Sequence, residues 1–198
     1  MTQHLYPADR IQEWEQRRHQ ANCCYKQGNL PEALALSTEN LHLARVIKDR
    51  AREGYALNDI GLACLSSWRP RQALASFQQA LIAAREIAHK RAEATTLSNL
   101  GSTYSRLGQF SQALDYLNEA LLLFRELQDA QGEVSALNNM ALIYIKLGEP
   151  KRSLLLQHQI LAMRRHLGDF SGEATTLNGI GFAYNSLKKY EQALQSFQ

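Results

Sequence analysis

Apolar residues recur along the chain at helical spacing, and the whole pattern returns every 40 residues. In its clearest copy, Leu97 is followed by Leu100, Gly101 and Tyr104, and these positions share one stripe of a helix with about 3.6 residues per turn. The same series restarts at Leu57, Leu137 and Leu177. A fixed period of this length predicts a stack of similar helical units.

Each unit reads as two helices joined by a tight turn. Gly108 interrupts the first stripe, and glycine is the residue that most readily ends a helix in a left-handed conformation. A second apolar stripe begins near Ser111. Glycine inside a helix costs about 1 kcal/mol relative to alanine, so Gly101 needs a packing reason. We expect it to let the two helices approach closely, against Ala113 and Ala120.

The series L-x2-L-G-x2-Y, followed by A-x3-F, resembles the signature of the tetratricopeptide repeat. The second and fifth repeats carry it as Leu57, Ile60, Gly61, Ala73 and Phe77, and as Leu177, Ile180, Gly181, Ala193 and Phe197. The closing proline of that signature is absent, and its place is taken by Arg45, Arg85, Arg125 and Arg165. The longer period is similar to the long-helix subclass found in kinesin light chains, Pins-type adaptors and bacterial arrays. The resemblance implies an all-α fold, a right-handed α-solenoid of about five helix-turn-helix units.

The period also predicts how the chain is divided. We expect a short N-terminal tail over residues 1–9, with Asp9 as the N-cap of a first helix over Arg10–Gln27. The repeats then span roughly 10–49, 50–89, 90–129, 130–169 and 170–198, the last one truncated within its second helix. Solenoids usually end in a capping helix with a polar outer face. Two expectations therefore stand: the chain is a fragment of a longer protein, or its uncapped C-terminal repeat supports self-association.

Composition argues against several classes of function. The 22 Lys and Arg residues and 19 Asp and Glu residues give a net charge of +3 without a basic run, so we expect no nucleic-acid partner. No stretch reaches the roughly 20 apolar residues of a membrane span, and residues 1–10 lack the apolar centre of a signal peptide. We therefore expect a cytoplasmic protein with no membrane partner.

The residue types that carry chemistry are scattered. Cys23, Cys24 and Cys64 match neither a disulfide framework nor a metal-ligand spacing, and the six histidines form no cluster with carboxylates. No nucleophile elbow or phosphate-binding loop occurs. We expect no enzyme: no catalytic residue, no metal and no cofactor.

Charged residues recur in register at the junctions between repeats. Asp49, Asp129 and Asp169 precede the first helices as candidate N-caps, with His89 in the fourth place. A second column consists of Glu13, Glu53, Glu93, Glu133 and Glu173, and the four Arg residues named above lie eight positions before the last four of these. We predict one structural Arg–Glu pair at each junction. A charge ladder that binds a ligand is the alternative.

The resemblance also implies a binding surface. In this family the first helices line a concave face, and positions one, five and eight residues after the signature leucine point into it. An amide there can donate to and accept from a peptide backbone, while apolar neighbours form pockets. The expected peptide-binding groove consists of Tyr55, Asn58, Leu62, Leu65, Ser98, Asn99, Asn138, Asn139, Leu142, Ile145, Asn178, Phe182 and Asn185. The alternative is that these Asn residues are only solvated or inter-repeat polar groups.

We therefore predict a protein–protein interaction module that holds a peptide or helical segment of a partner of unknown identity. The competing hypothesis is a regulatory or scaffold section of a larger multidomain signalling protein or enzyme. RNA reading by helical repeats is disfavoured by the near-neutral charge. The cationic clamp of some relatives is not matched, because Thr95 and Asn99 stand where it needs basic residues. Trp68, in a turn without glycine, is expected to pack over that turn, with a partner contact as the alternative.

Overall fold

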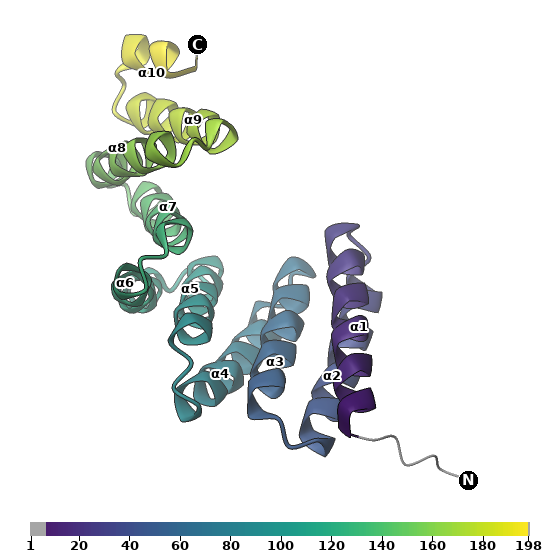
Figure 1. Ribbon diagram of the computed structural model, residues 1–198. Coiled ribbons are helices and arrows are strands. Elements are labelled where there is room, and N and C mark those ends of the chain that lie inside the picture. The colour runs from purple at the N-terminus through teal and green to yellow at the C-terminus, as the bar shows by residue number, and fades with distance from the viewer. Residues whose placement is uncertain (1–6, 198) are drawn as a thin grey trace. The chain divides into compact units, whose positions relative to one another are not determined.

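The computed structural model describes residues 7–197, and within this range every regular element is an α-helix (Figure 1). The helices are α1 (Pro7–Lys26), α2 (Leu30–Val46), α3 (Arg50–Ser66), α4 (Pro70–Glu86), α5 (Lys90–Arg106), α6 (Phe110–Glu126), α7 (Ala130–Lys146), α8 (Pro150–Leu167), α9 (Phe170–Ser186) and α10 (Tyr190–Phe197). The predicted all-α fold of paired helices is confirmed.

The start of the chain differs from the prediction in one respect. Helix α1 begins at Pro7, three residues before the expected Arg10. Asp9 therefore lies inside the first turn of α1 and is not its N-cap. An acidic side chain in this turn still interacts favourably with the helix dipole. Residues 1–6 of the predicted tail lie outside the described residues.

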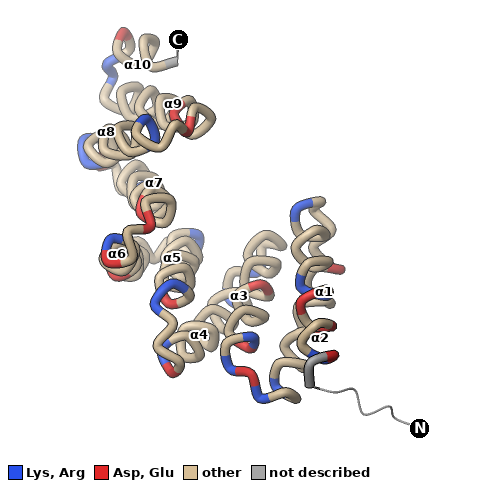
Figure 2. The backbone as a smooth tube through the Cα atoms, in the orientation of Figure 1, with Lys and Arg blue, Asp and Glu red and all other residues tan. Residues whose placement is uncertain are grey.

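The helices form two compact units, Met1–Leu107 and Gly108–Gln198. In the first unit each helix from α1 to α5 packs against the next one along the chain, and the same is true of α6 to α10 in the second. This nearest-neighbour packing is typical of a solenoid. Both units carry Lys and Arg together with Asp and Glu (Figure 2), although α8 has four basic residues, Lys151, Arg152, Arg164 and Arg165, and no acidic one.

A left-handed residue occurs every twenty residues, once in each connection between helices. Glycine takes this place at Gly28, Gly108, Gly148 and Gly168, and other residues take it at Lys48, Trp68, Ala88, Gln128 and Lys188. The Trp68 turn is closed by the Arg69 amide, which donates to the Cys64 carbonyl 2.9 Å away. The Trp68 side chain is 83% exposed, and the Arg106 guanidinium lies 5.5 Å from its ring centroid. A residue with a Cβ is strained in this conformation, which costs about 1–2 kcal/mol.

The signature glycine has a packing role that the sequence indicated only in part. A Cβ on Gly61 would come within 2.5 Å of the Phe77 ring, and Phe77 is fully buried in α4. The glycine therefore admits an aromatic ring of the second helix, whereas small alanines were the expected partners in the third repeat. Gly132 of α7 faces Phe124 of α6 in a similar way.

The N-caps and ion pairs predicted at the junctions between repeats are confirmed. The side chains of Asp49, Asp129, Asp169 and His89 each accept a hydrogen bond from a backbone amide in the first turn of the helix that follows. The junction pairs are Arg45–Glu53 at 2.9 Å, Arg85–Glu93 at 2.6 Å, Arg125–Glu133 at 2.8 Å and Arg165–Glu173 at 2.7 Å. These pairs tie each second helix to the first helix of the next repeat.

Helix α8 buries two polar side chains where the signature has Ala and Phe. Ser153 and Gln157 are both nearly inaccessible to solvent. The Ser153 hydroxyl and the Gln157 carbonyl oxygen find no hydrogen-bond partner in the part of the chain that the structure describes. A Cβ on Gly179 of α9 would lie only 2.8 Å from the Gln157 amide nitrogen, so the glycine makes room for this side chain. A buried polar group without a partner costs about 1–3 kcal/mol.

Candidate functional site

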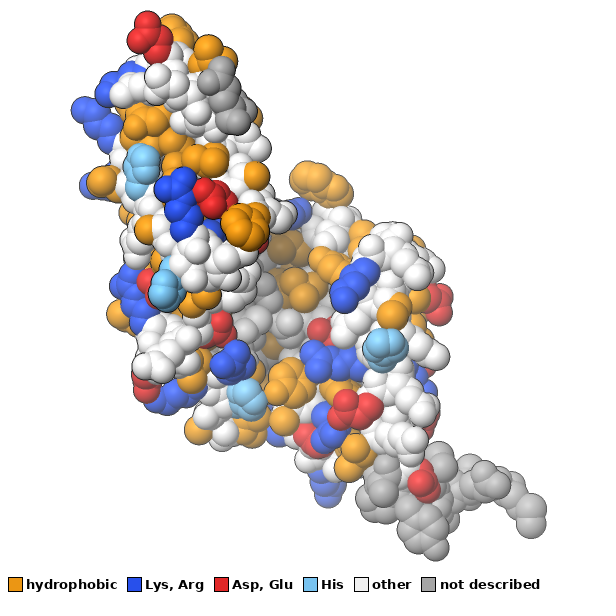
Figure 3. Space-filling model, turned by 45° about the horizontal axis from the view of Figure 1, so that its top comes forward, with side chains coloured by type: hydrophobic (Ala, Val, Ile, Leu, Met, Phe, Trp, Pro, Cys, Tyr) orange, Lys and Arg blue, Asp and Glu red, His pale blue; other side chains and the backbone are white. Residues whose placement is uncertain are grey.

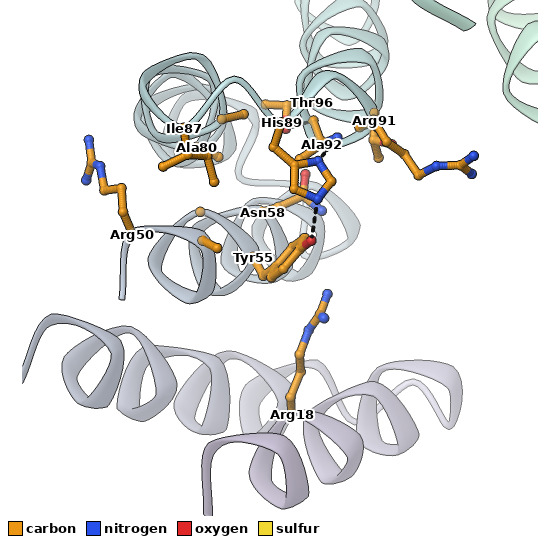
Figure 4. A pocket seen from close by; sticks show the side chains of 14 residues that line it. Arg18, Arg50, Tyr55, Asn58, Ala80, Ile87, His89, Arg91, Ala92 and Thr96 are labelled. Carbon is orange, nitrogen blue, oxygen red and sulfur yellow. Dashed lines mark hydrogen bonds between the residues drawn. The ribbon is translucent and has the colours of Figure 1, made fainter. Parts of the chain in front are cut away.

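A cavity of the first unit lies between α3, α4 and the N-terminal half of α5 and is bordered by α1 (Figure 4). We call it the α3–α5 cavity, and its volume is about 200 Å³. Its apolar wall consists of Ala51, Gly54, Ala80, Ala84, Ile87 and Ala92. Its polar side chains are Arg18, Arg50, Tyr55, Asn58, His89, Arg91, Thr95 and Thr96. Two of the predicted groove residues, Tyr55 and Asn58, are among them.

Tyr55 and His89 form the polar centre of the cavity. The Tyr55 hydroxyl lies 3.1 Å from His89 Nε2, and the two rings meet edge to face (Figure 4). His89 Nδ1 accepts from the Ala92 amide at 3.2 Å, because His89 is the N-cap of α5. A neutral imidazole that accepts at Nδ1 carries its proton on Nε2. His89 therefore donates to the Tyr55 oxygen, and the Tyr55 hydroxyl hydrogen is left for another acceptor.

Arg18 reaches from α1 toward this pair (Figure 4). Its guanidinium lies 4.7 Å from the centroid of the Tyr55 ring, a cation–π contact. Its Nε donates to Asp59 at 2.8 Å, which leaves the two terminal nitrogens directed elsewhere. Burial raises the pKa of the Asp59 carboxyl, and the hydrogen bond from Arg18 offsets only part of this rise.

The other two arginines at the cavity contribute less. Arg50 pairs with Glu53 at 2.7 Å and with Glu86 at 2.6 Å. The side chains of both Arg50 and Arg91 extend away from the Tyr55–His89 pair (Figure 4). The positive charge that faces the centre of the cavity is therefore that of Arg18.

Asn58 is held in one orientation by the neighbouring repeat. The Asn99 side-chain amide donates to the Asn58 carbonyl oxygen at 2.9 Å. This contact fixes the Asn58 amide so that its two N–H groups remain as donors, and they meet no acceptor among the described residues. The inter-repeat role and the recognition role, which were alternatives for this residue, are thus compatible.

The other four predicted groove residues of the first unit, Asn99, Leu62, Leu65 and Ser98, do not line this cavity. Leu62 is partly buried and borders a second, much smaller cavity with Tyr25 and Asp59. Leu65 is only 6% exposed and Ser98 only 9%, so their side chains offer no surface to a ligand. The expectation that these two residues line an open groove is not met.

The remaining predicted residues belong to α7 and α9 of the second unit. Leu142 is 51% exposed and Phe182 is 63% exposed, and Asn178 and Asn185 are also exposed. Asn138, Asn139 and Ile145 are partly buried. Single apolar side chains at a helix surface are common, and it is a contiguous apolar patch that marks a contact site.

Sequence reasoning missed the residues that complete the α3–α5 cavity. His89, Ile87 and Arg18 were not assigned to the site, although two signals were present. His89 interrupts the column of Asp N-caps, and Tyr55 interrupts a column of small hydroxyl residues, Thr95, Ser135 and Thr175. The structure shows that these two departures from the repeat pattern are partners in one contact.

Residues 7–197 were also compared with the requirements of a metal site, a membrane span and a charged patch. Within that range there is no group of three or more His, Cys, Asp or Glu side chains that could hold a metal ion. None of the described helices has the length and apolar character needed to cross a membrane. On the face drawn in Figure 3, basic and acidic side chains lie close to one another and do not gather into a patch of one sign.

Comparison with known proteins agrees with this architecture. The family model of the tetratricopeptide repeat matches residues 69–126 and 132–198. A search of curated proteins finds no match. Among solved structures, BtubC (BKLC) from P. vanneervenii is 20% identical with a TM-score of 0.79, and the match covers 96% of this chain and 86% of that one.

Two other similar structures are longer than this chain. A Rap protein complexed with competence and sporulation factor is 16% identical with a TM-score of 0.82, over 93% of this chain and 52% of that one. A signal transduction ATPase with a tetratricopeptide repeat sensor, from Pyrococcus horikoshii, is 16% identical with a TM-score of 0.80, over 98% of this chain and 30% of that one. At these identities the similarity shows the fold alone.

Proposed function

Because the chain belongs to the tetratricopeptide repeat family, we propose that it binds a peptide or helical segment of a partner protein. Repeats of this fold generally mediate protein–protein interaction. The observation that supports the proposal most directly is the α3–α5 cavity, which combines an apolar wall with hydrogen-bond donors that have no partner in the described chain. In a partner complex, Tyr55 and Asn58 would hold polar groups of the segment, and the wall around Ala80 and Ile87 would take an apolar side chain.

A second contact surface is proposed on the second unit. Leu142 and Phe182 present apolar surface, and Asn138 and Asn178 lie one turn before them on the same helices. This spacing places an amide and an apolar side chain together on the face of each helix. We propose that such amide and apolar pairs contact the same partner or a further part of it.

A pull-down experiment with the wild-type chain as bait, followed by identification of the proteins that it retains, tests the proposal. The variant Tyr55→Ala/Asn58→Ala removes the donors of the cavity, and Asn138→Ala/Phe182→Ala removes the contacts of the second unit. A matched control, Gln78→Ala/Gln79→Ala, changes two exposed positions of α4. Circular dichroism verifies that each variant keeps its helical content.

We expect the control to recover the same proteins as the wild type, and each site variant to lose at least one of them. Contacts of this kind each carry about 1–2 kcal/mol, so binding should weaken about five- to thirtyfold per residue. Equal recovery by all four baits would show that neither surface is the binding site.

The alternative is that the chain is the regulatory or scaffold section of a larger signalling protein or enzyme. The specific support for this hypothesis is that a similar fold forms only 30% of the Pyrococcus horikoshii ATPase, whose repeats are described as a sensor. The binding partner would then be another domain of the same protein. The sequence of the complete gene decides between the two hypotheses.

A further inference from the structure

Trp68, in the turn between α3 and α4, stands in a position that suits glycine. It has a φ of 57°, in the left-handed region, and three other turns within repeats have Gly28, Gly108 and Gly148 in the equivalent place. A residue with a Cβ is strained there, and the Trp68 ring is 83% exposed, so burial does not compensate for the strain. The ring therefore projects into solvent at a cost to the fold.

The two arginines that follow Trp68 also lie where they do not favour the fold. Arg69 is the N-cap of α4, and its side chain makes no capping hydrogen bond. Arg71 is the second residue of α4 and is exposed. A helix N-terminus carries partial positive charge, so a cation there is unfavourable, and the first turn of α4 has no acidic side chain to offset it. Residues that disfavour the local structure and gain no packing from it indicate a role outside the fold.

Two more cations flank this turn, one on each side. The Tyr25 hydroxyl lies 2.8 Å from Ser66 Oγ, so the end of α1, which carries Lys26, lies beside the end of α3. On the other side, Arg106 at the end of α5 donates through Nη1 to the Leu65 carbonyl at 3.2 Å. We call the surface formed by Lys26, Trp68, Arg69, Arg71 and Arg106 the turn edge of the first unit.

The four cations of the turn edge differ from the arginines at the junctions between repeats, because they have no carboxylate partner. At the junctions of the first unit, Arg45, Arg50, Arg52 and Arg85 each form ion pairs with acidic side chains at 2.5–2.9 Å. The cations of the turn edge are exposed, and none of them forms an ion pair within the described chain. The only acidic residue in the two connections concerned, residues 26–32 and 66–72, is Glu32. The turn edge therefore presents unpaired positive charge to a partner.

Three kinds of anionic partner make different demands on such a surface. A membrane requires apolar area that enters the lipid, and Trp68 is the one exposed large apolar side chain in these two connections, both of which the structure describes in full. A nucleic-acid strand carries a charge every ~3.4 Å, whereas the axes of packed helices, and with them these cations, are about 8–10 Å apart. In an extended protein segment, acidic residues three positions apart are separated by about 10 Å, and neutral residues between them fit beside Glu32. The spacing of the cations therefore favours a protein segment.

From these observations we propose that the turn edge binds an acidic segment of a partner protein in an extended conformation. Carboxylates of the segment pair with Lys26, with Arg69 and Arg71, and with Arg106. An apolar side chain of the segment packs on the Trp68 ring. The turn edge shares no residue with the α3–α5 cavity, so the inference goes beyond the proposed function and holds whether or not the cavity binds a segment.

The test uses two peptides that differ only in charge. The first is an acetylated and amidated octapeptide of alternating Asp and Glu with one central Leu, and the second replaces each Asp by Asn and each Glu by Gln. Each is titrated into the uniformly ¹⁵N-labelled chain at about 50 mM salt, where surface charges are only partly screened. The chain has two tryptophans, so the indole N–H signal of Trp68 reports binding and that of the buried Trp14 is the internal control. We expect the acidic peptide to shift the Trp68 signal alone, and the neutral peptide to bind at least about tenfold more weakly.

A matched pair of variants identifies the cations. Arg69→Gln/Arg71→Gln should weaken binding of the acidic peptide about tenfold and leave the thermal midpoint unchanged or raised, because it removes two cations from the N-terminus of α4. A purely structural role of these arginines would lower the midpoint and leave the affinity unchanged. Lys48→Gln/Arg85→Gln removes the same charge from the junctions between repeats and should leave the affinity within about twofold of the wild type.

A third variant tests the ring. Trp68→Gly gives this turn the residue that three equivalent turns have, so it should raise the thermal midpoint. It should also weaken the acidic peptide about fivefold, as followed by the Ser67 amide signal. A Trp68→Gly chain that binds the peptide as tightly as the wild type would overturn the assignment of Trp68 to the site.

Equal binding of the two peptides, no shift of the Trp68 signal at about 5 mM peptide, or full affinity in Arg69→Gln/Arg71→Gln would each overturn the proposal. Tighter binding of a single-stranded DNA octamer, or of vesicles that contain phosphatidylserine, would overturn it as well, because the partner would then be a nucleic acid or a membrane.

The cavity variant Tyr55→Ala/Asn58→Ala separates this inference from the proposed function. It should bind the acidic peptide with unchanged affinity. If it loses the peptide, the segment lies in the α3–α5 cavity and the turn edge is not the site. If the peptide binds the turn edge but no captured protein depends on Tyr55 and Asn58, the proposed function of the cavity fails while this inference stands.

Discussion

Substitution of Gly61 by alanine tests the packing that joins the two helices of the second repeat. Taken alone, Gly→Ala in a helix is stabilising by about 1 kcal/mol because alanine has the higher helix propensity. At Gly61, however, the new Cβ would lie 2.5 Å from Phe77 Cε1 and 2.7 Å from both Cδ1 and Cζ. Carbon atoms pack at about 3.5–4.0 Å, so the ring or the helix must move by about 1 Å.

The cost of this movement exceeds the gain in propensity. Phe77 is 0% exposed, and its neighbours leave it no free volume to move into. Overpacking a buried site costs typically about 1–3 kcal/mol, and the upper half of this range applies to a ring held on all sides. The net effect of Gly61→Ala is therefore a loss of about 1–2 kcal/mol in the free energy of unfolding.

Urea denaturation followed by circular dichroism measures this loss. With a slope of about 2 kcal/mol per molar, the midpoint should fall by roughly 0.5–1 M. Gly54→Ala serves as the control, because its Cβ would meet its nearest atom, Ala83 Cβ, at 3.3 Å, and its midpoint should stay close to that of the wild type. The double variant Gly61→Ala/Phe77→Leu should show a favourable coupling of about 1 kcal/mol. A Gly61→Ala protein as stable as the wild type, without coupling to position 77, would refute the packing.

Three more predictions concern the junctions between repeats. Arg125→Glu should destabilise the chain by less than about 1 kcal/mol because that side chain is half exposed, and adding Glu133→Arg should restore part of the loss in a double-mutant cycle. Ala88→Gly should raise the urea midpoint, since it relieves a left-handed alanine with φ of 52°, whereas Ala75→Gly within α4 should lower it by about 1 kcal/mol. Burial raises the pKa of Glu53, but hydrogen bonds from two arginines outweigh it and leave that pKa below its ordinary value of 4.5. The ionised form thus stabilises the fold above the unfolded pKa, and wild-type stability should fall more steeply than that of Glu53→Gln as the pH drops from about 5 to about 3.

The sequence alone predicted the helices, their turns and the contacts that repeat in every unit. The period fixes which positions are equivalent, and the Asp caps and Arg–Glu pairs involve residues only three and eight positions apart. Such local contacts follow from helix geometry and need no knowledge of distant parts of the chain.

The cavity could not be derived in the same way. It depends on residues that break the repeat, and His89 meets Tyr55 across 34 positions because α3 and α5 both pack against α4. The repeat pattern also does not predict how deeply a side chain is buried. Leu65 has the spacing of a groove residue, yet Arg106 of α5 donates to its carbonyl at 3.2 Å, and its side chain is buried. Periodicity identifies a helix face, whereas burial depends on what the next helix places over it.

The buried Ser153 and Gln157 of α8 have a consequence for how the chain opens. In a solenoid each helix is stabilised only by its neighbours, so a helix with weak packing gains no stability from distant repeats. Helix α8 packs against α7 and α9, and three of its buried polar atoms, Ser153 Oγ, Gln157 Oε1 and Arg164 Nε, have no hydrogen-bond partner among the described residues. The free energy of local unfolding is lowest where such buried polar groups regain hydrogen bonds to water. We therefore expect amide protons of α8 to exchange by an opening smaller than global unfolding, which would also expose this helix to a protease.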